Sequence, residues 1–367
     1  MPSKAQTGAA ATRIQQVRAS MKKAGVDALV INNAAAIRYI TGFSGSAGMV
    51  ILSMRTLDFF TNDLYAVQVT KELVKVNGLR VHINRDFWGA ARHAELNTKY
   101  KNIGFNASTT TVLGWQQMKK GLAPAKLADV GDLVSKITAV KTKSEIRSIS
   151  KAAEITSQAY QLMLGIVQPG MTEHEVATFL ASRTRELGSE RDAFDIIVVS
   201  GKRSAMPHGR ATQATITSGS VVTVDFGCCI DGLYSDMTRT FFVGKPPKQV
   251  VDVFAVLYDA HLTALDAVKE GVTGSQLDAV ARDIITEAGY GEYFRHSLGH
   301  GLGYDVHENP RIAPTVSAEP IEANTVITIE PGIYIPGKFG MRIEDDVVVA
   351  KNGSQILTSA PRELVVV

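Results

Sequence analysis

The chain has 367 residues, of which 45% are hydrophobic and 20% charged, and a formal net charge of +3. This is the composition of an ordinary globular protein, and the length predicts two domains rather than one hydrophobic core. No long Lys/Arg cluster indicates nucleic acid binding, and no apolar run reaches the roughly 18 residues of a membrane span. The adjacent Cys228 and Cys229 suit no structural disulfide, and no signal-peptide pattern begins the chain, so we expect a cytoplasmic protein.

Helix and strand patterns alternate in the first part of the chain. The hydrophobic spacing predicts helices over 14–24, 64–75 and 111–120, and strands at 27–33, 56–62 and 101–106. A glycine-rich segment, TGFSGSAG at 41–48, is expected to be a turn that leads into a further strand. Because this part contains no spaced cluster of Asp, Glu and His, we interpret residues 1–138 as a scaffold or substrate-shaping domain.

A second domain is expected over residues 139–367, beginning with a polar break and a helix that has Ser144 as its predicted N-cap. This domain contains an internal repeat. Two segments have matching patterns: QPGMTEHEVATFLASRTRELG, which ends at Gly188, and KEGVTGSQLDAVARDIITEAG, which ends at Gly289. In both copies a Thr is followed three residues later by Glu or Gln, the pattern of a helix capping box. The repeat predicts two αβ units packed about a pseudo-twofold axis.

Acidic residues interrupt the apolar strands of this repeat at matching positions. Asp225 in VVTVDFG corresponds to Glu330 in VITIEPG, and a second carboxylate follows each of them, Asp236 and Glu344. Burying a carboxylate costs several kcal/mol unless it meets a cation, a metal or hydrogen-bond donors. A pseudo-twofold axis would bring all four to one centre, where oxygen ligands from two sides can hold two divalent ions about 3.5–4 Å apart.

A further ligand is expected in RHSLGHGLGYDVHENP, residues 295–310, where His296, His300 and His307 lie close together. The glycines between them disfavour a regular helix and allow the backbone to approach a site. A histidine can bind a metal through one ring nitrogen while an acceptor holds the other. We expect Glu308 and Asp345, beside these candidates, to face solvent.

Four motifs together resemble the pita-bread metallopeptidases, the family of aminopeptidase P, prolidase and methionine aminopeptidase: the Asp-x10-Asp pair, HSLGHGLG, EPGIYI and RIEDD. IRYITGFSGSAG, at 37–48, resembles the creatinase-like amino-terminal domain of aminopeptidase P and prolidase. The resemblance implies an α/β (α+β) fold with a creatinase-like domain over 1–138. It also implies a pita-bread catalytic domain with a pseudo-twofold internal repeat over 139–367.

Carried over by position, the resemblance implies specific roles. The ligands of two divalent metal ions would be Asp225, Asp236, His300, Glu330 and Glu344. The catalytic groups would be His208 in AMPHG, His307, and Glu330 acting also as proton shuttle. The substrate side would include His296, Arg311, Tyr334 and Arg342. An oxygen-rich site with one His suits Mn²⁺, with Zn²⁺, Co²⁺ and Fe²⁺ as alternatives.

The resemblance also implies the reaction, in which the two ions activate a shared water that attacks the peptide carbonyl before proline. We place an Xaa-Pro aminopeptidase first, because TGFSGSAG is more typical of aminopeptidase P. The alternative is an Xaa-Pro dipeptidase, since Arg311 could bind a dipeptide's terminal carboxylate. A non-catalytic binding protein is the third hypothesis, against which all five ligand positions argue. The expected partners are proline-containing peptides and, by resemblance, a second copy in a homodimer.

Overall fold

The structure is a computed structural model that describes residues 4–316 and 318–367. The chain divides into two compact units, residues 1–138 and 139–367, each of which is described by itself. Within the described residues, no helix combines the length and the apolar character that crossing a membrane requires.

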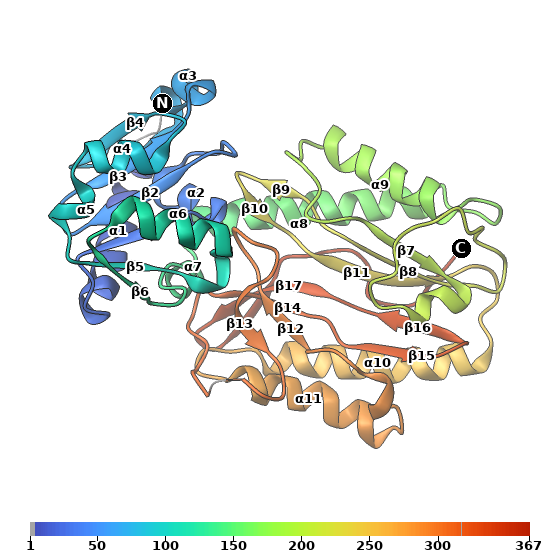
Figure 1. Cartoon of the computed structure of the whole chain (residues 1–367). Coiled ribbons are helices and arrows are strands. Elements are labelled where there is room, and N and C mark those ends of the chain that lie inside the picture. The colour runs from blue at the N-terminus through green and yellow to red at the C-terminus, as the bar shows by residue number, and fades with distance from the viewer. Residues whose placement is uncertain (1–3, 317) are drawn as a thin grey trace. The chain divides into compact units, whose positions relative to one another are not determined.

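The first unit is built on a six-stranded sheet with the strand order β4-β3-β2-β1-β5-β6 (Figure 1). Its strands are β1 (Ala28–Ile31), β2 (Met49–Ser53), β3 (Leu57–Thr61), β4 (Leu79–Ile83), β5 (Asn102–Phe105) and β6 (Lys126–Asp129). Its α-helices are α1 (Lys4–Lys23), α2 (Ala34–Thr41), α3 (Ala66–Glu72), α4 (Phe87–His93), α5 (Leu96–Lys99), α6 (Val112–Leu122) and α7 (Ser135–Thr138). The β1–β2 and β2–β3 pairs are antiparallel and the other pairs are parallel.

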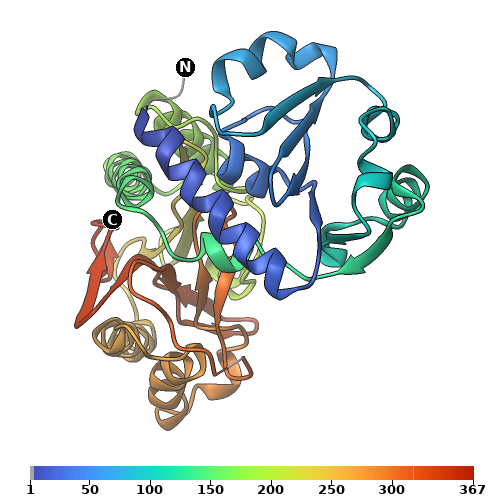
Figure 2. The same ribbon diagram turned by 90° about the vertical axis from the view of Figure 1, so that its left-hand side faces the viewer.

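Two helices of this unit differ from the sequence-based expectation. Helix α1 begins at Lys4 and not at residue 14 (Figure 2). The alanine-rich segment that precedes residue 14 favours helix, and Ala10 is buried. Helix α2 was not expected at all. Asn33 caps its N-terminus and Gly42, with φ of +79°, ends it, so local capping outweighs the β-branched residues that favour a strand here.

The second unit sandwiches its strands between two helix pairs (Figure 1). The helices α8 (Lys143–Leu164) and α9 (Glu173–Glu186) cover one side, and α10 (Lys248–Ala267) and α11 (Gly274–Glu287) cover the other. One sheet contains β19 (Val365–Val366), β11 (Met237–Phe242), β8 (Val221–Phe226) and β7 (Ile197–Ser200). The other contains β13 (Glu308–Ile312), β12 (Gly299–Gly301), β14 (Val326–Ile329), β17 (Asp345–Ala350) and β18 (Gly353–Ile356). Two small hairpins complete it, β9 (Cys229–Ile230) with β10 (Leu233–Tyr234), and β15 (Gly332–Ile335) with β16 (Phe339–Arg342).

The two halves of this unit repeat one arrangement, as the sequence predicted. Capping boxes open both α9 and α11, with Thr172 and Thr273 as the N-caps. Each half then supplies an antiparallel strand pair, β8 with β11 and β14 with β17. The prediction of Ser144 as N-cap of α8 is wrong, because Thr142 caps that helix in a third capping box with Glu145.

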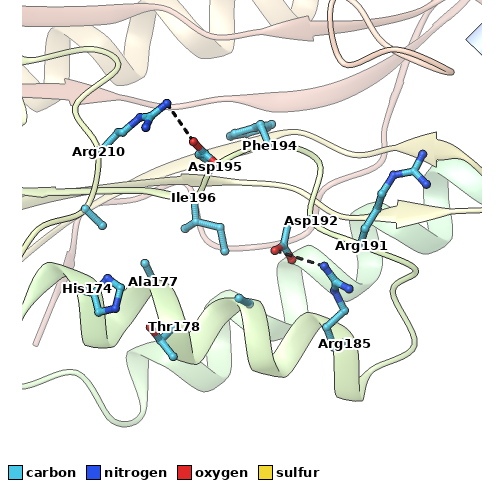
Figure 3. A pocket seen from close by; sticks show the side chains of 12 residues that line it. His174, Ala177, Thr178, Arg185, Arg191, Asp192, Phe194, Asp195, Ile196 and Arg210 are labelled. Atoms are coloured by element: carbon cyan, nitrogen blue, oxygen red, sulfur yellow. Dashed lines mark ion pairs between the residues drawn. The ribbon is translucent and has the colours of Figure 1, made fainter. Parts of the chain in front are cut away.

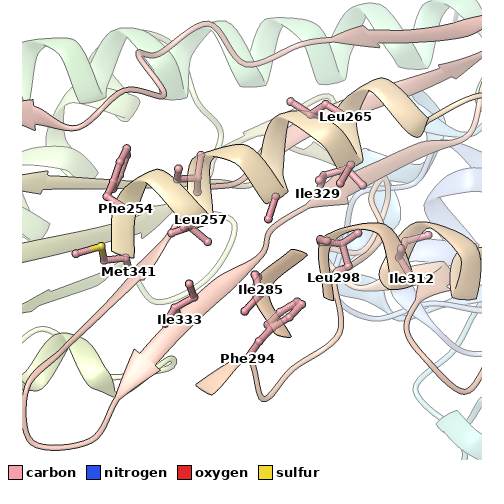
Figure 4. Close-up of a cluster of buried hydrophobic side chains, with 14 of the residues drawn as sticks. Phe254, Leu257, Leu265, Ile285, Phe294, Leu298, Ile312, Ile329, Ile333 and Met341 are labelled. Carbon is pink, nitrogen blue, oxygen red and sulfur yellow. The ribbon is translucent and has the colours of Figure 1, made fainter. Parts of the chain in front are cut away.

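A large core cluster lies between the α10–α11 pair and the strands (Figure 4). From α10, Phe254, Leu257 and Leu265 project toward the strands, where Ile329 and Met341 meet them. Burial of each such side chain stabilises the fold by about 1.5–3 kcal/mol. The cluster therefore fixes the strand ends at which the acidic residues of the second repeat lie.

We expect Leu257→Ala to lower the free energy of unfolding by about 2–5 kcal/mol, because it removes buried methyl groups and leaves a cavity. Urea unfolding followed by circular dichroism measures this loss. Val251→Ala is the matched control on the same helix, since Val251 is 46% exposed. It should change the unfolding free energy by less than about 0.5 kcal/mol. Equal effects of the two substitutions would contradict the assigned core face.

Candidate metal centre

Four carboxylates lie at the ends of the two repeated strand pairs. Asp225 is on β8 and Asp236 directly precedes β11, while Glu330 directly follows β14 and Glu344 directly precedes β17. The residues Asp225, Asp236 and Glu344 are all buried. The fold thus gathers, from two hairpins more than 100 residues apart in sequence, the acidic side chains that the repeat placed at matching positions.

His300, in the middle of β12, joins this cluster. Ligand atoms of Asp236, His300 and Glu344 all lie within 4.8 Å of one another. The His300 Nε2 atom is 3.3 Å from Glu330 Oε1 and 3.8 Å from Asp236 Oδ2. Its Nδ1 lies 3.0 Å from the Gly301 carbonyl oxygen, which can only accept, so Nδ1 carries a proton and Nε2 is the ring nitrogen that faces the carboxylates.

The donor set fits divalent cations. The Oδ1 atoms of both Asp225 and Asp236 are buried without a hydrogen-bond partner. Burial, together with the negative charge of Glu344 and Asp225, raises the pKa of Asp236 well above its ordinary value. Burial and the charges of Glu330 and Asp225 do the same to the pKa of Glu344. A divalent cation would bind these unpartnered carboxylate oxygens and neutralise their mutual repulsion.

Glu330 differs from the other carboxylates. Burial alone would raise its pKa, but the hydrogen bond and charge of His300, with the charges of His296 and Arg342, outweigh burial and lower it to about 2. The same contact raises the pKa of His300 despite the opposing effect of its burial. Glu330 is therefore ionised at neutral pH.

Arg342, on β16, connects the cluster to its surroundings. Its Nη2 donates to Asp225 Oδ2 at 2.6 Å and its Nε donates to Thr238 Oγ1 at 2.9 Å. Its Nη1 donates to the hydroxyl of Tyr334, which also lies 3.0 Å from His296 Nε2. Arg342, Tyr334 and His296 thus form one hydrogen-bonded chain that starts from Asp225.

The remaining candidates lie around this centre. The His307 ring is 4.3 Å from the His300 ring, centroid to centroid. Burial, followed by the charge of His300, lowers the pKa of His307, so its ring is neutral at neutral pH. Arg311 is exposed on β13 and is the register partner of His300. His208 is exposed, and it lies near enough to Asp225 and His307 to influence their pKa values.

Two residues outside the predicted site set, Thr238 and Asp346, hold the ligands. Thr238 donates its hydroxyl to Glu344 Oε2 at 2.7 Å. The carboxylate of Asp346 accepts the backbone N–H of Asp236 at 3.1 and 3.2 Å. Strand periodicity is the signal that could have found Thr238, because it lies two residues from Asp236 and so shares its face.

The expectation that Glu308 and Asp345 face solvent is wrong. Asp345 is fully buried, and Arg239, His261 and Arg362 all bind its carboxylate. Glu308 forms a buried ion pair with Lys141. In each case a basic residue distant in the sequence compensates the buried charge, and no local pattern reveals that partner.

A separate groove of about 560 Å³ lies along α9 (Figure 3). Arg185 pairs with Asp192 there at 3.4 Å, and Arg210 pairs with Asp195 at 3.2 Å. None of the residues that line the groove belongs to the cluster around His300. The third arginine of the lining, Arg191, donates to the hydroxyl of Tyr234.

Comparison with known proteins gives consistent results. Residues 147–351 match the model of metallopeptidase family M24, and residues 13–140 match that of the creatinase/prolidase N-terminal domain. An Xaa-Pro dipeptidase of Pyrococcus horikoshii is 34% identical over 96% of this chain and 98% of its own length.

Two solved structures are similar along nearly the whole chain. The Xaa-Pro dipeptidase from Bacillus anthracis has a TM-score of 0.93 and 37% identity, covering 98% of this chain and 100% of that one. The X-Pro aminopeptidase from Thermotoga maritima has a TM-score of 0.88 and 36% identity, covering 96% and 99%. One of these two proteins is named a dipeptidase and the other an aminopeptidase.

We expect Asp236→Asn to raise the melting temperature of the metal-free protein at pH 8. The raised pKa means that Asp236 favours folding when protonated, and this contribution is lost as pH rises through the folded-state pKa. A gain of about 1 kcal/mol would raise melting by roughly 2–4 °C for a domain of this size. Scanning calorimetry in EDTA at pH 8 and pH 5 measures the difference, which should shrink at pH 5.

The matched control is Asp231→Asn, an exposed aspartate at a positive-φ turn position in the β9–β10 hairpin, where asparagine is equally acceptable. It should leave melting unchanged at both pH values. Added Mn²⁺ should stabilise the wild type and the control but not Asp236→Asn. A metal-free Asp236→Asn protein that melts below the wild type would refute the repulsion argument.

Proposed function

Since the chain belongs to metallopeptidase family M24, we propose that it is an Xaa-Pro dipeptidase, which hydrolyses the bond before proline in dipeptides. The sequence analysis placed the aminopeptidase first and this activity as the alternative. Relatives from Pyrococcus horikoshii and Pyrococcus furiosus that bear the name Xaa-Pro dipeptidase support the alternative, at 34% identity each. Xaa-Pro aminopeptidase activity is the second candidate, because the X-Pro aminopeptidase from Thermotoga maritima is also similar to this chain.

The observation that carries this proposal is the position of Arg311. It is the direct partner of His300 across the β12–β13 hairpin, and such partners project to the same face of a sheet. Arg311 is also near enough to His307 for its charge to lower that pKa. A guanidinium binds a carboxylate through two parallel hydrogen bonds. In an Xaa-Pro dipeptide the terminal carboxylate is one residue from the scissile bond, so Arg311 could select for that length.

We assign the metal ligands to Asp225, Asp236, His300, Glu330 and Glu344, and expect them to hold two divalent ions. Mn²⁺ suits this oxygen-rich set best, with Zn²⁺, Co²⁺ or Fe²⁺ as alternatives. The unpartnered Oδ1 atoms of Asp225 and Asp236 support the assignment. Bound ions of this kind lower the pKa of a shared water and polarise the carbonyl that it attacks.

The protein's own groups then handle protons and orientation. Glu330, ionised at neutral pH, accepts a proton from the attacking water. It returns that proton to the proline nitrogen, which leaves as a secondary amine when the C–N bond breaks. His307 is neutral and donates its N–H to the oxygen that becomes negative. His208 orients the substrate from the exposed side.

We expect the proline ring to pack against the hydrogen-bonded chain that starts from Asp225. His296 and Tyr334 present their rings at 5.5 Å from each other, centroid to centroid. Arg342 holds Asp225 and Tyr334 in place at once. Proline has no N–H and a fixed φ, so its recognition depends on shape more than on backbone hydrogen bonds. The homodimer and the cytoplasmic location stay predictions from the sequence.

We expect Arg311→Met to raise KM for Gly-Pro by about 10-fold or more, because loss of a charged hydrogen bond costs about 1.5–3 kcal/mol. Initial rates with Mn²⁺ on Gly-Pro and on a Gly-Pro-containing pentapeptide measure both the effect and the length preference. Arg295→Met is the control, because it removes an exposed arginine that precedes β12. It should change neither KM for Gly-Pro nor the length preference. Equal cleavage of both peptides by the wild type, unaffected by Arg311→Met, would favour the aminopeptidase.

Glu344→Ala should abolish turnover. Mutation of a residue that hydrogen-bonds to a metal ligand typically lowers metal affinity or activity by about 10–100-fold. Loss of a ligand itself should therefore lower activity by more than about 100-fold. Steady-state rates, together with metal content by mass spectrometry of the dialysed protein, check this. Glu322→Ala, an exposed glutamate of the same half, is the control. Full activity of Glu344→Ala would show that the ligand set is wrong.

A further inference from the structure

One buried carboxylate, that of Glu173, ties down both ends of the loop that carries His208. Glu173 is the first residue of α9 and has 0% exposure. At the start of the loop, Ser200 donates its N–H to Glu173 Oε1 at 2.8 Å and its hydroxyl at 3.1 Å. At the end, Thr212 donates its N–H to Oε2 at 3.2 Å and its hydroxyl at 2.9 Å. Residues 201–211 are thus closed at their base by one side chain.

The guanidinium of Arg203, inside the loop, also binds the Glu173 carboxylate. Arg203 donates its Nε to both oxygens of Glu173, at 3.2 and 3.1 Å. Its Nη2 donates to the carbonyl of Arg210 at 2.8 Å, which crosses the loop from one side to the other. The start of α9 adds backbone bonds, since His174 donates its N–H to the carbonyl of Thr212 at 2.9 Å. His208 lies between Arg203 and Arg210 and so within the braced segment.

On its other side, the same loop contacts the support of the metal centre. Ser204 Oγ accepts the N–H of Gly340 at 2.8 Å. The carbonyl of Pro207, next to His208, accepts from Arg342 Nη1 at 3.2 Å. Arg342 in turn binds Asp225. The loop is therefore held between the carboxylate of Glu173 and the arginine that orients a candidate metal ligand.

The second half of the repeat uses the same device for another histidine. Asp278 on α11 is fully buried, binds Arg282 and accepts the N–H of Leu298 at 3.0 Å. Arg282 also donates to the carbonyl of His296 at 2.8 Å. In both halves a carboxylate from the second helix, with an arginine, fixes a loop that carries a site histidine. This recurrence points to positioning of the loop as the shared purpose.

We propose that Glu173 is a positioning residue that sets the His208 loop for catalysis. It does not touch the substrate, because its carboxylate is fully buried and already accepts hydrogen bonds from Ser200, Arg203 and Thr212. The proposal rests on the proposed function only for the contact between His208 and the substrate. The anchoring of residues 201–211 can be tested without any activity.

The test substitution is Glu173→Gln. A glutamine keeps one acceptor oxygen but turns an NH₂ group toward Ser200, Arg203 and Thr212, which are all donors here, so several bonds must break. We expect amide hydrogen exchange measured by mass spectrometry to accelerate across 201–211 and not elsewhere in the unit. We expect kcat for Gly-Pro to fall about 10-fold with KM within about 2-fold, because misplaced groups cost rate more than binding.

Glu175→Gln is the matched control, two residues further along the same helix. Glu175 serves the capping box of α9, and Gln276 fills the same role in α11, so glutamine is acceptable there. The control should change neither exchange nor kcat. In a His208→Ala background, Glu173→Gln should cost no further kcat, since its effect passes through His208.

Faster exchange spread evenly over the unit, or an equal kcat loss in the His208→Ala background, would overturn the proposal. If Glu173→Gln does not fold, Thr212→Val, which removes one donor at the far end of the loop, is judged by the same two measurements. A wild type that cleaves neither Gly-Pro nor longer Xaa-Pro peptides would refute the proposed function. The exchange measurement would still decide whether Glu173 anchors the loop.

Discussion

The crowding of four carboxylates at one point, three of them buried, is the constraint on which the catalytic unit depends. Unpaired, these charges repel one another and face a large desolvation cost. The protein compensates only part of it: Arg342 binds Asp225, His300 lies beside Glu330, and Thr238 donates to Glu344. Asp236 lies 3.8 Å from His300 Nε2, a nitrogen that is closer to Glu330, and burial together with the charges of Glu344 and Asp225 raises the pKa of Asp236. The remaining compensation falls to the metal ions that this arrangement suits.

The internal repeat explains how a chain can tolerate that crowding. Each half contributes one strand pair, and the repulsion is opposed by two hydrophobic layers between the strands and the helix pairs. Buried area stabilises the unit over many side chains, so the acidic centre can be locally unfavourable without unfolding it. Flexible loops would not hold the site histidines in fixed positions. The buried pairs Glu173–Arg203 and Asp278–Arg282 extend it to the loops that carry His208 and His296.

Much of this could be predicted from the sequence, and the reasons are local. Apolar periodicity located β3, β5 and α6, and Thr-x-x-Glu/Gln spacing located the starts of α9 and α11. The offset of 105 between Asp225 and Glu330 indicated two matched halves. Helix α2 escaped because it has only eight residues, and its start and stop depend on Asn33 and Gly42.

What the sequence by itself determined is therefore the set of chemical groups and the repeat that brings them together, since both follow from residue type and spacing. Tertiary structure alone decided which charges are compensated. The partners of Asp345, Glu308 and Glu173 lie between 17 and 167 residues away and have no fixed spacing. Buried ion pairs depend on distances in space, which periodicity does not encode. For the same reason only the folded hairpin places Arg311 opposite His300.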